Sequence, residues 1–397
     1  MPRYVIDEAV LTRNLEILAA VRKRAGVKIL LAQKAFSCFD LYPLVAKYLD
    51  GATASGLFEA RLAHEEMPGK ENHMFAPAFR AEDMPELLRI VNHIVFNSPR
   101  QVEKFGTMAR AAGVSVGLRV NPEVSVATTP AYDPCRPGSR LGTLRGGVDA
   151  AWGGSRVRAT ENVLPIDGLH FHCLCEQGVE ELRKVLAGFE AKFGDLLPQM
   201  KWVNFGGGHH ITRADYDVDG LVELLLDFRR RHPHLTVYLE PGEAVALDAG
   251  TLEATVLEIQ SPGADGISNA ILDVSAACHM PDVLEMPYTP RVTGANVVSG
   301  GHSTDDLRQS VSRYGYRFGG PTCLAGDMIG MYSFPHPLAE GDTVVFEDMA
   351  IYSMVKNNTF NGMPLPAIAV RRMTGEIELL RAFGYADFKG RLGGVGD

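Results

Sequence analysis

Signals for export and for membrane insertion are missing from this sequence. The first residues, MPRYVIDEAVLTRN, show no basic segment followed by an apolar one, and no uninterrupted apolar run is long enough to span a bilayer. The six cysteines form no CxxC pair, which favours reduced thiols and a cytoplasmic protein. An excess of basic residues is also lacking. The formal net charge of -9 argues against nucleic-acid binding and is compatible with a cationic ligand.

What the sequence does contain is a regular alternation of apolar runs and helix-period segments from residue 27 to about 240. The predicted strands are 27–32, 51–55, 73–78, 93–97, 115–121, 168–174, 202–208 and 236–242. Amphipathic segments lie between most of them, at 40–49, 82–91, 100–113, 179–197 and 218–232. Eight such units predict an α/β fold, a parallel (β/α)8 barrel of the TIM type, whose chemistry collects at the carboxyl ends of the strands.

Two segments break this alternation. Residues 122–166 are rich in Pro, Gly, Thr and Arg, and we expect them to form a long functional loop with one helix. Beyond about residue 250 the runs are short and β-rich, with Gly and Pro between them. This pattern predicts a second, β-rich domain of the β-sandwich or β-barrel-like kind, with the boundary near residue 248.

Chemically useful residues follow the predicted barrel strands. They are Lys34 after the first strand, Arg119 and Asn121 after the fifth, His170 and His172 on the sixth, Gly206, Gly207 and Gly208 after the seventh, and Glu240 and Glu243 after the eighth. An amine, an imidazole, a glycine turn and a carboxylate would therefore meet at one rim of the barrel.

One cofactor, pyridoxal 5′-phosphate, uses all of these groups. It needs a lysine for covalent attachment, a phosphate cradle, a flat group against the ring and an acid facing the pyridine nitrogen. A glycine turn can bring N–H groups to a phosphate without Cβ interference, and a nearby carboxylate favours the protonated pyridine. A protonated ring is a strong electron sink, which suits the loss of CO2 from a substrate. Lys34 would then be a desolvated, reactive amine.

Six motifs spread over nearly the whole chain carry a family resemblance: AQKAF, FHCLCE, NFGGGHH, LEPGEA, GGPTCLAGD and YSMVKNNTFNG. On these motifs the sequence resembles the alanine-racemase-fold (fold type III) pyridoxal-dependent decarboxylases of ornithine, arginine and diaminopimelate. Within that group it is most similar to the decarboxylases of carboxynorspermidine and carboxyspermidine, which serve polyamine biosynthesis. The resemblance implies that a cationic carboxypolyamine is converted to norspermidine or spermidine. It also implies that residues 1–7 join 249–397 in the β-rich domain, with 8–248 as the cofactor-binding barrel.

The resemblance implies roles for residues of the barrel. Lys34 would bond the aldehyde of the cofactor, and His172, rather than His170, would lie against its ring. The turn Gly206–Gly208 would hold the phosphate, and Glu240 would face the pyridine nitrogen.

For the β-rich domain, the resemblance implies that Cys323 reaches the site of a neighbouring subunit and helps to protonate the product carbon. Tyr352 would contact the phosphate, and Phe360 and Asn361 would flank the site. The related enzymes are head-to-tail homodimers with composite sites, so we expect a homodimer.

Two positions depart from the family pattern. Glu243 follows EPG where the ornithine and diaminopimelate enzymes have an arginine, and Leu324 follows GPTC where the ornithine enzymes have an aspartate. A substrate with two ammonium groups would suit additional carboxylates, so we expect Glu243, Asp282 and Asp327 to bind it. Weaker candidates for contacts with cofactor or substrate are Asn121, Arg140 and Asp273, and Ser55 is a candidate for supporting the residues that make such contacts.

Several alternatives stay open. The substrate could be ornithine, arginine or diaminopimelate, and the sequence does not decide between carboxynorspermidine and carboxyspermidine, which differ by one methylene. A zinc hydrolase could use His170 and His172 with Cys175, His209 and Asp282 as ligands, although such enzymes carry their HxH on the first strand. A non-catalytic carrier of pyridoxal phosphate would lack the β-rich domain. A racemase would have an arginine where Glu240 stands.

Overall fold

The computed structural model describes residues 1–153, 164–263, 266–298 and 314–394. The chain divides into two compact units, one of residues 12–245 and one of residues 1–11 and 246–397. The domain limits predicted from the sequence stay a prediction, because compactness does not show which segments fold independently. These limits are 8–248 for the barrel and 1–7 with 249–397 for the β-rich domain. Part of the predicted 122–166 loop, residues 154–163, lies outside the described residues.

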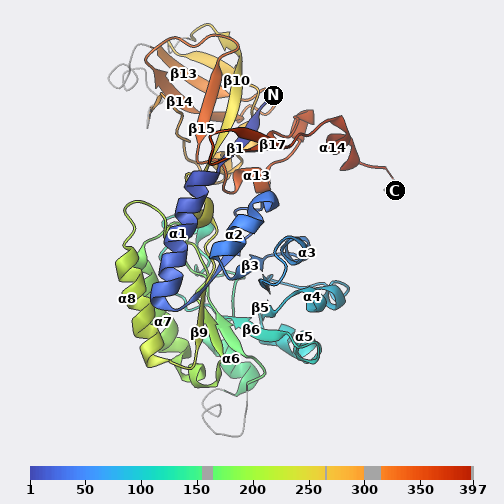
Figure 1. Ribbon diagram of the computed structural model, residues 1–397, viewed down its shortest axis with the longest axis vertical. Coiled ribbons are helices and arrows are strands. Elements are labelled where there is room, and N and C mark those ends of the chain that lie inside the picture. Colours follow the sequence, from blue (N-terminus) through green and yellow to red (C-terminus); the bar gives the residue numbers. More distant parts are fainter. Residues whose placement is uncertain (154–163, 264–265, 299–313, 395–397) are drawn as a thin grey trace. The chain divides into compact units, whose positions relative to one another are not determined.

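A closed barrel of eight parallel strands forms the centre of the unit of residues 12–245 (Figure 1). In barrel order the strands are β2 (Lys28–Ala32), β3 (Gly51–Ala54), β4 (Glu71–Phe75), β5 (His93–Phe96), β6 (Ser115–Arg119), β7 (Gly168–His170), β8 (Trp202–Asn204) and β9 (Thr236–Leu239). β9 pairs with β2 and closes the barrel. The predicted (β/α)8 barrel is confirmed.

Helices lie outside the barrel strands, as α3, α4 and α5 do beside β3 to β6 in Figure 1. The helices and 3-10 turns are α1 (Glu8–Ala25), η1 (Phe39–Leu41), α2 (Tyr42–Tyr48), α3 (Leu57–Glu66), α4 (Met84–Ile90), α5 (Pro99–Ala111), η2 (Pro130–Tyr132), α6 (Arg145–Trp152), α7 (Val179–Phe193), η4 (Gly194–Gln199), α8 (Val218–Arg231) and α9 (Glu243–Ala246). In the described ranges, none of the helices has the length and apolar character needed to cross a membrane.

Helix α8 illustrates why these segments are helical. Asp217 caps its first turn, because the side chain accepts a hydrogen bond from the N–H of Gly220. Leu221, Leu225 and Phe228 follow at helical spacing and are fully buried. The last turn is basic, which complements the negative end of the helix dipole. Capping and an apolar stripe therefore place the helix against the barrel.

The strands end earlier than the predicted spans 168–174 and 202–208. β7 ends at His170 and β8 at Asn204. Gly206 has a φ of 69° and Gly208 a φ of 87°, conformations that are incompatible with continued strand pairing. The residues that were predicted at strand ends therefore lie in turns at the carboxyl rim of the barrel.

The unit of residues 1–11 and 246–397 contains a mixed sheet with the strand order β12-β14-β13-β11-β10-β1-β16-β17, and β15 pairs with β10. Its strands are β1 (Arg3–Asp7), β10 (Gly250–Gln260), β11 (Ser268–Leu272), β12 (Asn296–Val297), β13 (Tyr314–Gly319), β14 (Met328–Phe334), β15 (Thr343–Glu347), β16 (Ala367–Arg371) and β17 (Ile377–Arg381). Short helices and one 3-10 turn connect them: α10 (Ala276–His279), α11 (Asp282–Glu285), α13 (Ser353–Lys356), η5 (Phe360–Gly362) and α14 (Tyr385–Gly390). The second, β-rich domain is confirmed, and its described strands form one sheet that branches at β10.

The core of this sheet is apolar and aromatic. Phe318, Tyr332 and Phe346 are completely buried, and Phe318 contacts the Tyr332 ring with a centroid distance of 4.7 Å. β1 lies inside the sheet, antiparallel to β10 and parallel to β16. The first residues of the chain are therefore part of the sheet core.

Candidate active site

The predicted barrel residues gather where β2, β7, β8 and β9 end. Lys34, His172, Gly206 and Glu240 each follow one of these strands within a few residues. The carboxyl ends of parallel barrel strands share one rim, so the four positions face the same space. In agreement with this, the charge of Lys34 acts on His172 and the charge of Glu240 acts on Lys34.

The backbone around Lys34 is held from two sides. The N–H of Ala32 donates to the carbonyl of Pro241 (2.9 Å), and the N–H of Gln33 donates to the carbonyl of Thr53 (3.2 Å). Lys34 therefore starts from a turn fixed between the end of β3 and the segment that follows β9.

The Lys34 ammonium is destabilised. Its side chain stays accessible to solvent, but the protein atoms that crowd around it desolvate the charge and lower the pKa, and the Arg119 guanidinium lowers it further. Glu240 and Glu243 act in the opposite direction without reversing the shift. A larger fraction of Lys34 is therefore neutral, and able to act as a nucleophile, than of an ordinary lysine.

His172 is a neutral imidazole in a defined tautomer. Its Nδ1 accepts a hydrogen bond from the N–H of Gly207 (2.9 Å), so the ring proton is on Nε2. Burial, together with the charges of Lys34 and Arg119, sets the pKa of His172 well below its usual value. Arg119 also donates to the carbonyl of His172 (3.0 Å), which fixes the backbone at this position.

The turn Gly206–Gly208 accepts only glycine. A Cβ on Gly207 would lie 2.0 Å from the carbonyl oxygen of Glu240, and one on Gly208 would lie 2.0 Å from that of Leu174. The N–H of Gly206 donates to Oδ1 of Asn204 (2.8 Å). The turn therefore packs directly against the segment that follows β9, with the N–H groups of Gly206 and Gly207 bonded to Asn204 and His172.

Glu240 carries a stable negative charge. Its side chain is 11% exposed, and its two oxygens accept hydrogen bonds from Asn204 Nδ2 (2.7 Å) and His170 Nε2 (3.3 Å). Burial alone would raise the pKa of Glu240, but the neighbouring imidazoles and the Asn204 amide outweigh it and lower the pKa to about 2. The carboxylate is therefore ionised at neutral pH.

Glu243 lies on the same rim and is paired. Its Oε2 is 2.9 Å from Nε2 of His210. Burial alone would lower the pKa of His210, but the carboxylate of Glu243 outweighs it and raises the pKa. Since the charge of Glu243 also acts on Lys34, this acid lies within electrostatic reach of the reactive amine.

In the sheet unit, Cys323 is exposed and its Sγ lies 3.1 Å from Oδ1 of Asn361. The thiol donates to the amide oxygen, so it holds a proton at this position. Tyr352 and Asn361 have positive φ angles of 54° and 59°. Such backbone strain in residues other than glycine often marks functional segments.

Two predicted substrate acids of the sheet unit have partners within it. Asp327 is 3% exposed and accepts hydrogen bonds from Ser275 Oγ (2.9 Å) and Thr322 Oγ1 (2.6 Å). This geometry favours a structural role for Asp327 over a contact with the substrate. Asp282 forms an ion pair with Lys356, which neutralises part of its charge, and its contact with substrate stays a prediction.

The weaker candidates hold turns. Oδ1 of Asn121 accepts from the N–H of Glu123 (2.8 Å), and Oδ1 of Asp273 accepts from the N–H of Thr255 (2.7 Å). The carbonyl of Arg140 accepts from the side chain of Asn97 (2.8 Å). These contacts organise loops, and any contact with a ligand stays a prediction.

Sequence reasoning missed three members of the site. Asn204 had no assigned role and His210 was expected to be a structural or loop residue, yet they form hydrogen bonds with Glu240 and Glu243. Glu59, in the first turn of α3, accepts a hydrogen bond from the N–H of Ser55 (2.6 Å), and the charge of Lys34 acts on it. Asn204 directly precedes the FGGG run, and that adjacency was the available signal.

The set of groups fits pyridoxal 5′-phosphate. This cofactor requires an amine that can lose its proton, an ionised carboxylate, a glycine turn and a neutral imidazole. Two buried imidazole nitrogens, Nδ1 of His170 and Nε2 of His209, have no hydrogen-bond partner among the described residues, so the rim has polar capacity left for a ligand. In the described parts of the chain, His170 and His172 belong to no group of three converging metal ligands, so the geometry does not favour the zinc alternative.

Comparison with known proteins agrees with this chemistry. Residues 3–350 match the family model described as pyridoxal-dependent decarboxylase, C-terminal sheet domain. A carboxyaminopropylagmatine decarboxylase of Synechocystis is 43% identical over 393 residues, which are 99% of this chain and 95% of that protein. A carboxynorspermidine/carboxyspermidine decarboxylase of Campylobacter jejuni is 42% identical over 395 residues, with coverages of 98% and 97%.

A solved structure is similar over the same extent. The crystal structure of carboxynorspermidine decarboxylase from Campylobacter jejuni, complexed with norspermidine, gives a TM-score of 0.88 at 39% identity. The match covers 98% of this chain and 99% of that one. At this identity the likeness extends beyond the fold.

Proposed function

The chain belongs to the family of pyridoxal-dependent decarboxylases, and we propose that it releases CO2 from carboxynorspermidine or carboxyspermidine with pyridoxal 5′-phosphate as its cofactor. The observation that carries this proposal is the convergence of Lys34, His172 and Glu240 at the carboxyl rim of the barrel. The polyamine class of the substrate is supported by the Campylobacter jejuni relative and by the related structure that contains norspermidine.

Each barrel residue has a defined task in this reaction. When bound, the cofactor supplies an electron sink for the pair that remains as CO2 leaves. Lys34 would hold its aldehyde carbon, since the neutral amine is the nucleophilic form. Glu240, ionised at neutral pH, would keep a proton on the ring nitrogen, and His172 would lie against the ring. The turn Gly206–Gly208 would hold the phosphate.

The ammonium groups of the substrate would meet carboxylates. Glu243 is already within electrostatic reach of Lys34, and its partner His210 holds it in place. We propose Glu243 and Asp282 as substrate-binding acids, because opposite charges at the rim attract a cationic amine and exclude neutral competitors.

We further propose that the active form is a homodimer, with Cys323 and Tyr352 of one chain completing the site of the other. The thiol of Cys323 holds a proton through Asn361 and would deliver it to the product carbon. Three exposed apolar side chains support a covered surface: Leu324 and Met328, which are near Cys323 in the sequence, and Phe360, which is next to its partner Asn361. The six cysteines, all among the described residues, form no disulfide with one another, which supports a cytoplasmic location.

A second candidate for the substrate is carboxyaminopropylagmatine. The relative with that name is 43% identical, which is as similar as the carboxynorspermidine/carboxyspermidine enzyme at 42%. Agmatine ends in a guanidinium group, which binds a carboxylate through two parallel hydrogen bonds. Glu243 could supply that carboxylate.

Steady-state release of CO2 from the three carboxylated amines tests the proposal, with L-ornithine, L-arginine and meso-diaminopimelate as controls. We expect kcat/KM for one carboxylated amine to exceed the values for the amino acids by at least about 100-fold, since beyond the α-amino acid head the carboxylated amines carry two cationic groups and the amino acids carry one, which leaves a carboxylate of the site unpaired. Equal rates for all six compounds would contradict a polyamine substrate. The highest value for carboxyaminopropylagmatine would favour the second candidate.

A further inference from the structure

A group of ionisable side chains lies inside the barrel where strands β4 and β5 begin, apart from the residues assigned to the reaction. Glu71 and His93 are the first residues of their strands, and His73 follows Glu71 on β4. In the described part of the chain, these three are the group whose ligand atoms converge, all within 4.8 Å of one another. Neither the cofactor chemistry nor the substrate acids use them.

The hydrogen bonds define how the imidazoles are protonated. Nε2 of His73 lies 3.0 Å from Oε2 of Glu71, and a carboxylate can only accept, so Nε2 carries the proton. Nδ1 of His73 therefore carries a lone pair when the ring is neutral, and it accepts a hydrogen bond from Nδ1 of His93. The two nitrogens lie 3.3 Å apart.

This separation matches two ligands of one metal ion. With Zn–N bonds of about 2.0–2.1 Å and tetrahedral angles, two ligating nitrogens lie about 3.3–3.4 Å apart. A ligating histidine also typically donates its other N–H to a carboxylate, which fixes the tautomer and raises the basicity of the ligand. Glu71 stands in that position relative to His73.

We propose that His73 and His93 form a binding site for a divalent transition metal such as Zn²⁺ or Ni²⁺, with Glu71 as the carboxylate that orients His73. Water fills the remaining coordination positions. The charge of His73 acts on Glu240, but the proposal rests on none of the residues assigned to the reaction, so it stands or falls separately from the proposed function.

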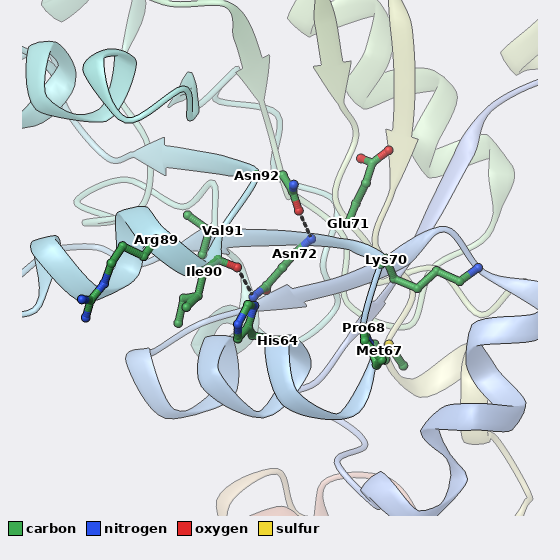
Figure 2. Close-up of a pocket in the computed structure, with 11 residues that line it drawn as sticks. His64, Met67, Pro68, Lys70, Glu71, Asn72, Arg89, Ile90, Val91 and Asn92 are labelled. Carbon is green, nitrogen blue, oxygen red and sulfur yellow. Dashed lines mark hydrogen bonds between the residues drawn. The ribbon is translucent and has the colours of Figure 1, made fainter.

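Lys28 tunes the site. Its ammonium forms an ion pair with Glu71 and so competes with a metal for the negative charge of the carboxylate. Figure 2 shows that the Glu71 side chain points away from His64, Met67 and Pro68, which line a neighbouring cavity of about 480 Å³. Glu71 also belongs to the lining of that cavity, but His73 and His93 do not, and His64 provides a matched control.

Trp202 is a built-in reporter. Its ring stacks on the ring of His93 with a centroid distance of 5.1 Å and an interplanar angle of 9°. A Cβ on Gly117 or Gly168 would lie within 2.4 Å or 2.1 Å of the indole, so both glycines make room for this ring. The chain has two tryptophans, and Trp152→Phe leaves Trp202 alone.

The experiment titrates the cofactor-loaded Trp152→Phe protein with Ni²⁺ and follows tryptophan fluorescence, while a chromophoric chelator measures Zn²⁺ in competition. Ni²⁺ is preferred to Cu²⁺ because Cu²⁺ oxidises exposed thiols such as Cys323. We expect saturable quenching and one metal per chain. His93→Gln should weaken binding at least tenfold, whereas His64→Gln should leave it unchanged.

Two further variants keep the test decisive if His93→Gln fails to fold. Glu71→Gln should weaken binding about 10- to 100-fold, the usual effect of losing such a carboxylate. Lys28→Met should strengthen it several-fold, because it releases Glu71 from its ion pair. Three outcomes would each overturn the site. The first is absence of quenching, and the second is equal metal affinity of the His93→Gln and His64→Gln proteins. The third is a change of metal affinity in the same direction in Glu71→Gln and Lys28→Met.

Discussion

Nε2 of His170 lies 3.3 Å from Oε2 of Glu240, although the two residues are 70 positions apart in the sequence. Burial lowers the pKa of His170, so at neutral pH it is an uncharged hydrogen-bond donor. The carboxylate therefore accepts a hydrogen bond without being neutralised by a cation. A full negative charge stays available for a protonated ring nitrogen.

Glu240→Gln removes this charge and keeps the shape of the side chain. We expect kcat to fall roughly 100- to 1,000-fold, the usual effect of losing one electrostatic group at a reacting centre. Stopped-flow measurement of CO2 release with saturating substrate checks this. The matched control is Asn204→Ala, which removes one hydrogen bond to the carboxylate and keeps its charge, so its kcat should fall less. Wild-type kcat in the Glu240→Gln enzyme would contradict the assigned role.

The lowered pKa of Lys34 predicts high reactivity in cofactor-free protein. Each pKa unit of lowering increases the fraction of neutral amine about tenfold at a given pH. At pH 8 we therefore expect an acylating reagent to label Lys34 faster than the average surface lysine, as measured by peptide mass spectrometry. Glu243→Gln should increase the labelling rate, because the charge of Glu243 raises this pKa. Labelling at or below the average rate would show that the ammonium is not destabilised.

The glycine turn predicts a sharp contrast between two substitutions. Gly207→Ala places a Cβ 2.0 Å from the Glu240 carbonyl, so the backbone must move, at an expected loss of about 1–3 kcal/mol in the free energy of unfolding. Gly146→Ala adds a methyl group in open space within α6 and should stabilise the protein by about 0.5–1 kcal/mol. Urea unfolding measures both effects. Equal stability of the two variants would show that the close approach at Gly207 is not maintained in solution.

The pair of His210 and Glu243 predicts a pH-dependent contribution to stability. Folding raises the pKa of His210 above its usual 6.5, so the folded protein holds this proton more tightly than the unfolded chain. The stabilisation is complete below about pH 6.5 and is lost as the pH rises through the raised value. Glu243→Gln should therefore lower the free energy of unfolding by roughly 1–3 kcal/mol at pH 6 and by less at pH 9. A loss that is the same at both pH values would contradict the charged pair.

Local sequence patterns were sufficient to predict the barrel. Apolar runs of five to seven residues, most of them between amphipathic helices, gave all eight strands, since each buried parallel strand must be apolar on both faces. The carboxyl ends were less predictable. In β8 the apolar pattern continues after Asn204, but positive φ angles at Gly206 and Gly208 end the pairing.

The candidate site was predictable only where one residue type has one chemical use. Lys34 and Glu240 stood out because a lysine or an acid is costly at the end of an apolar strand. Asn204 and the group of Glu71, His73 and His93 did not, because their meaning depends on partners from other strands. Closure of the barrel brings these partners together, and the sequence of a single strand does not show which residues of other strands will be its neighbours.

The position of β1 between β10 and β16 has a consequence during synthesis. The ribosome releases β1 first and makes β16 roughly 360 residues later, a delay of about 20–70 s at 5–20 residues per second. For all of that time one edge of β1 has no partner strand. A nascent chain that stalls before residue 367 therefore exposes a backbone edge on which a second nascent chain can pair, and this is the stage at which a chaperone would be needed.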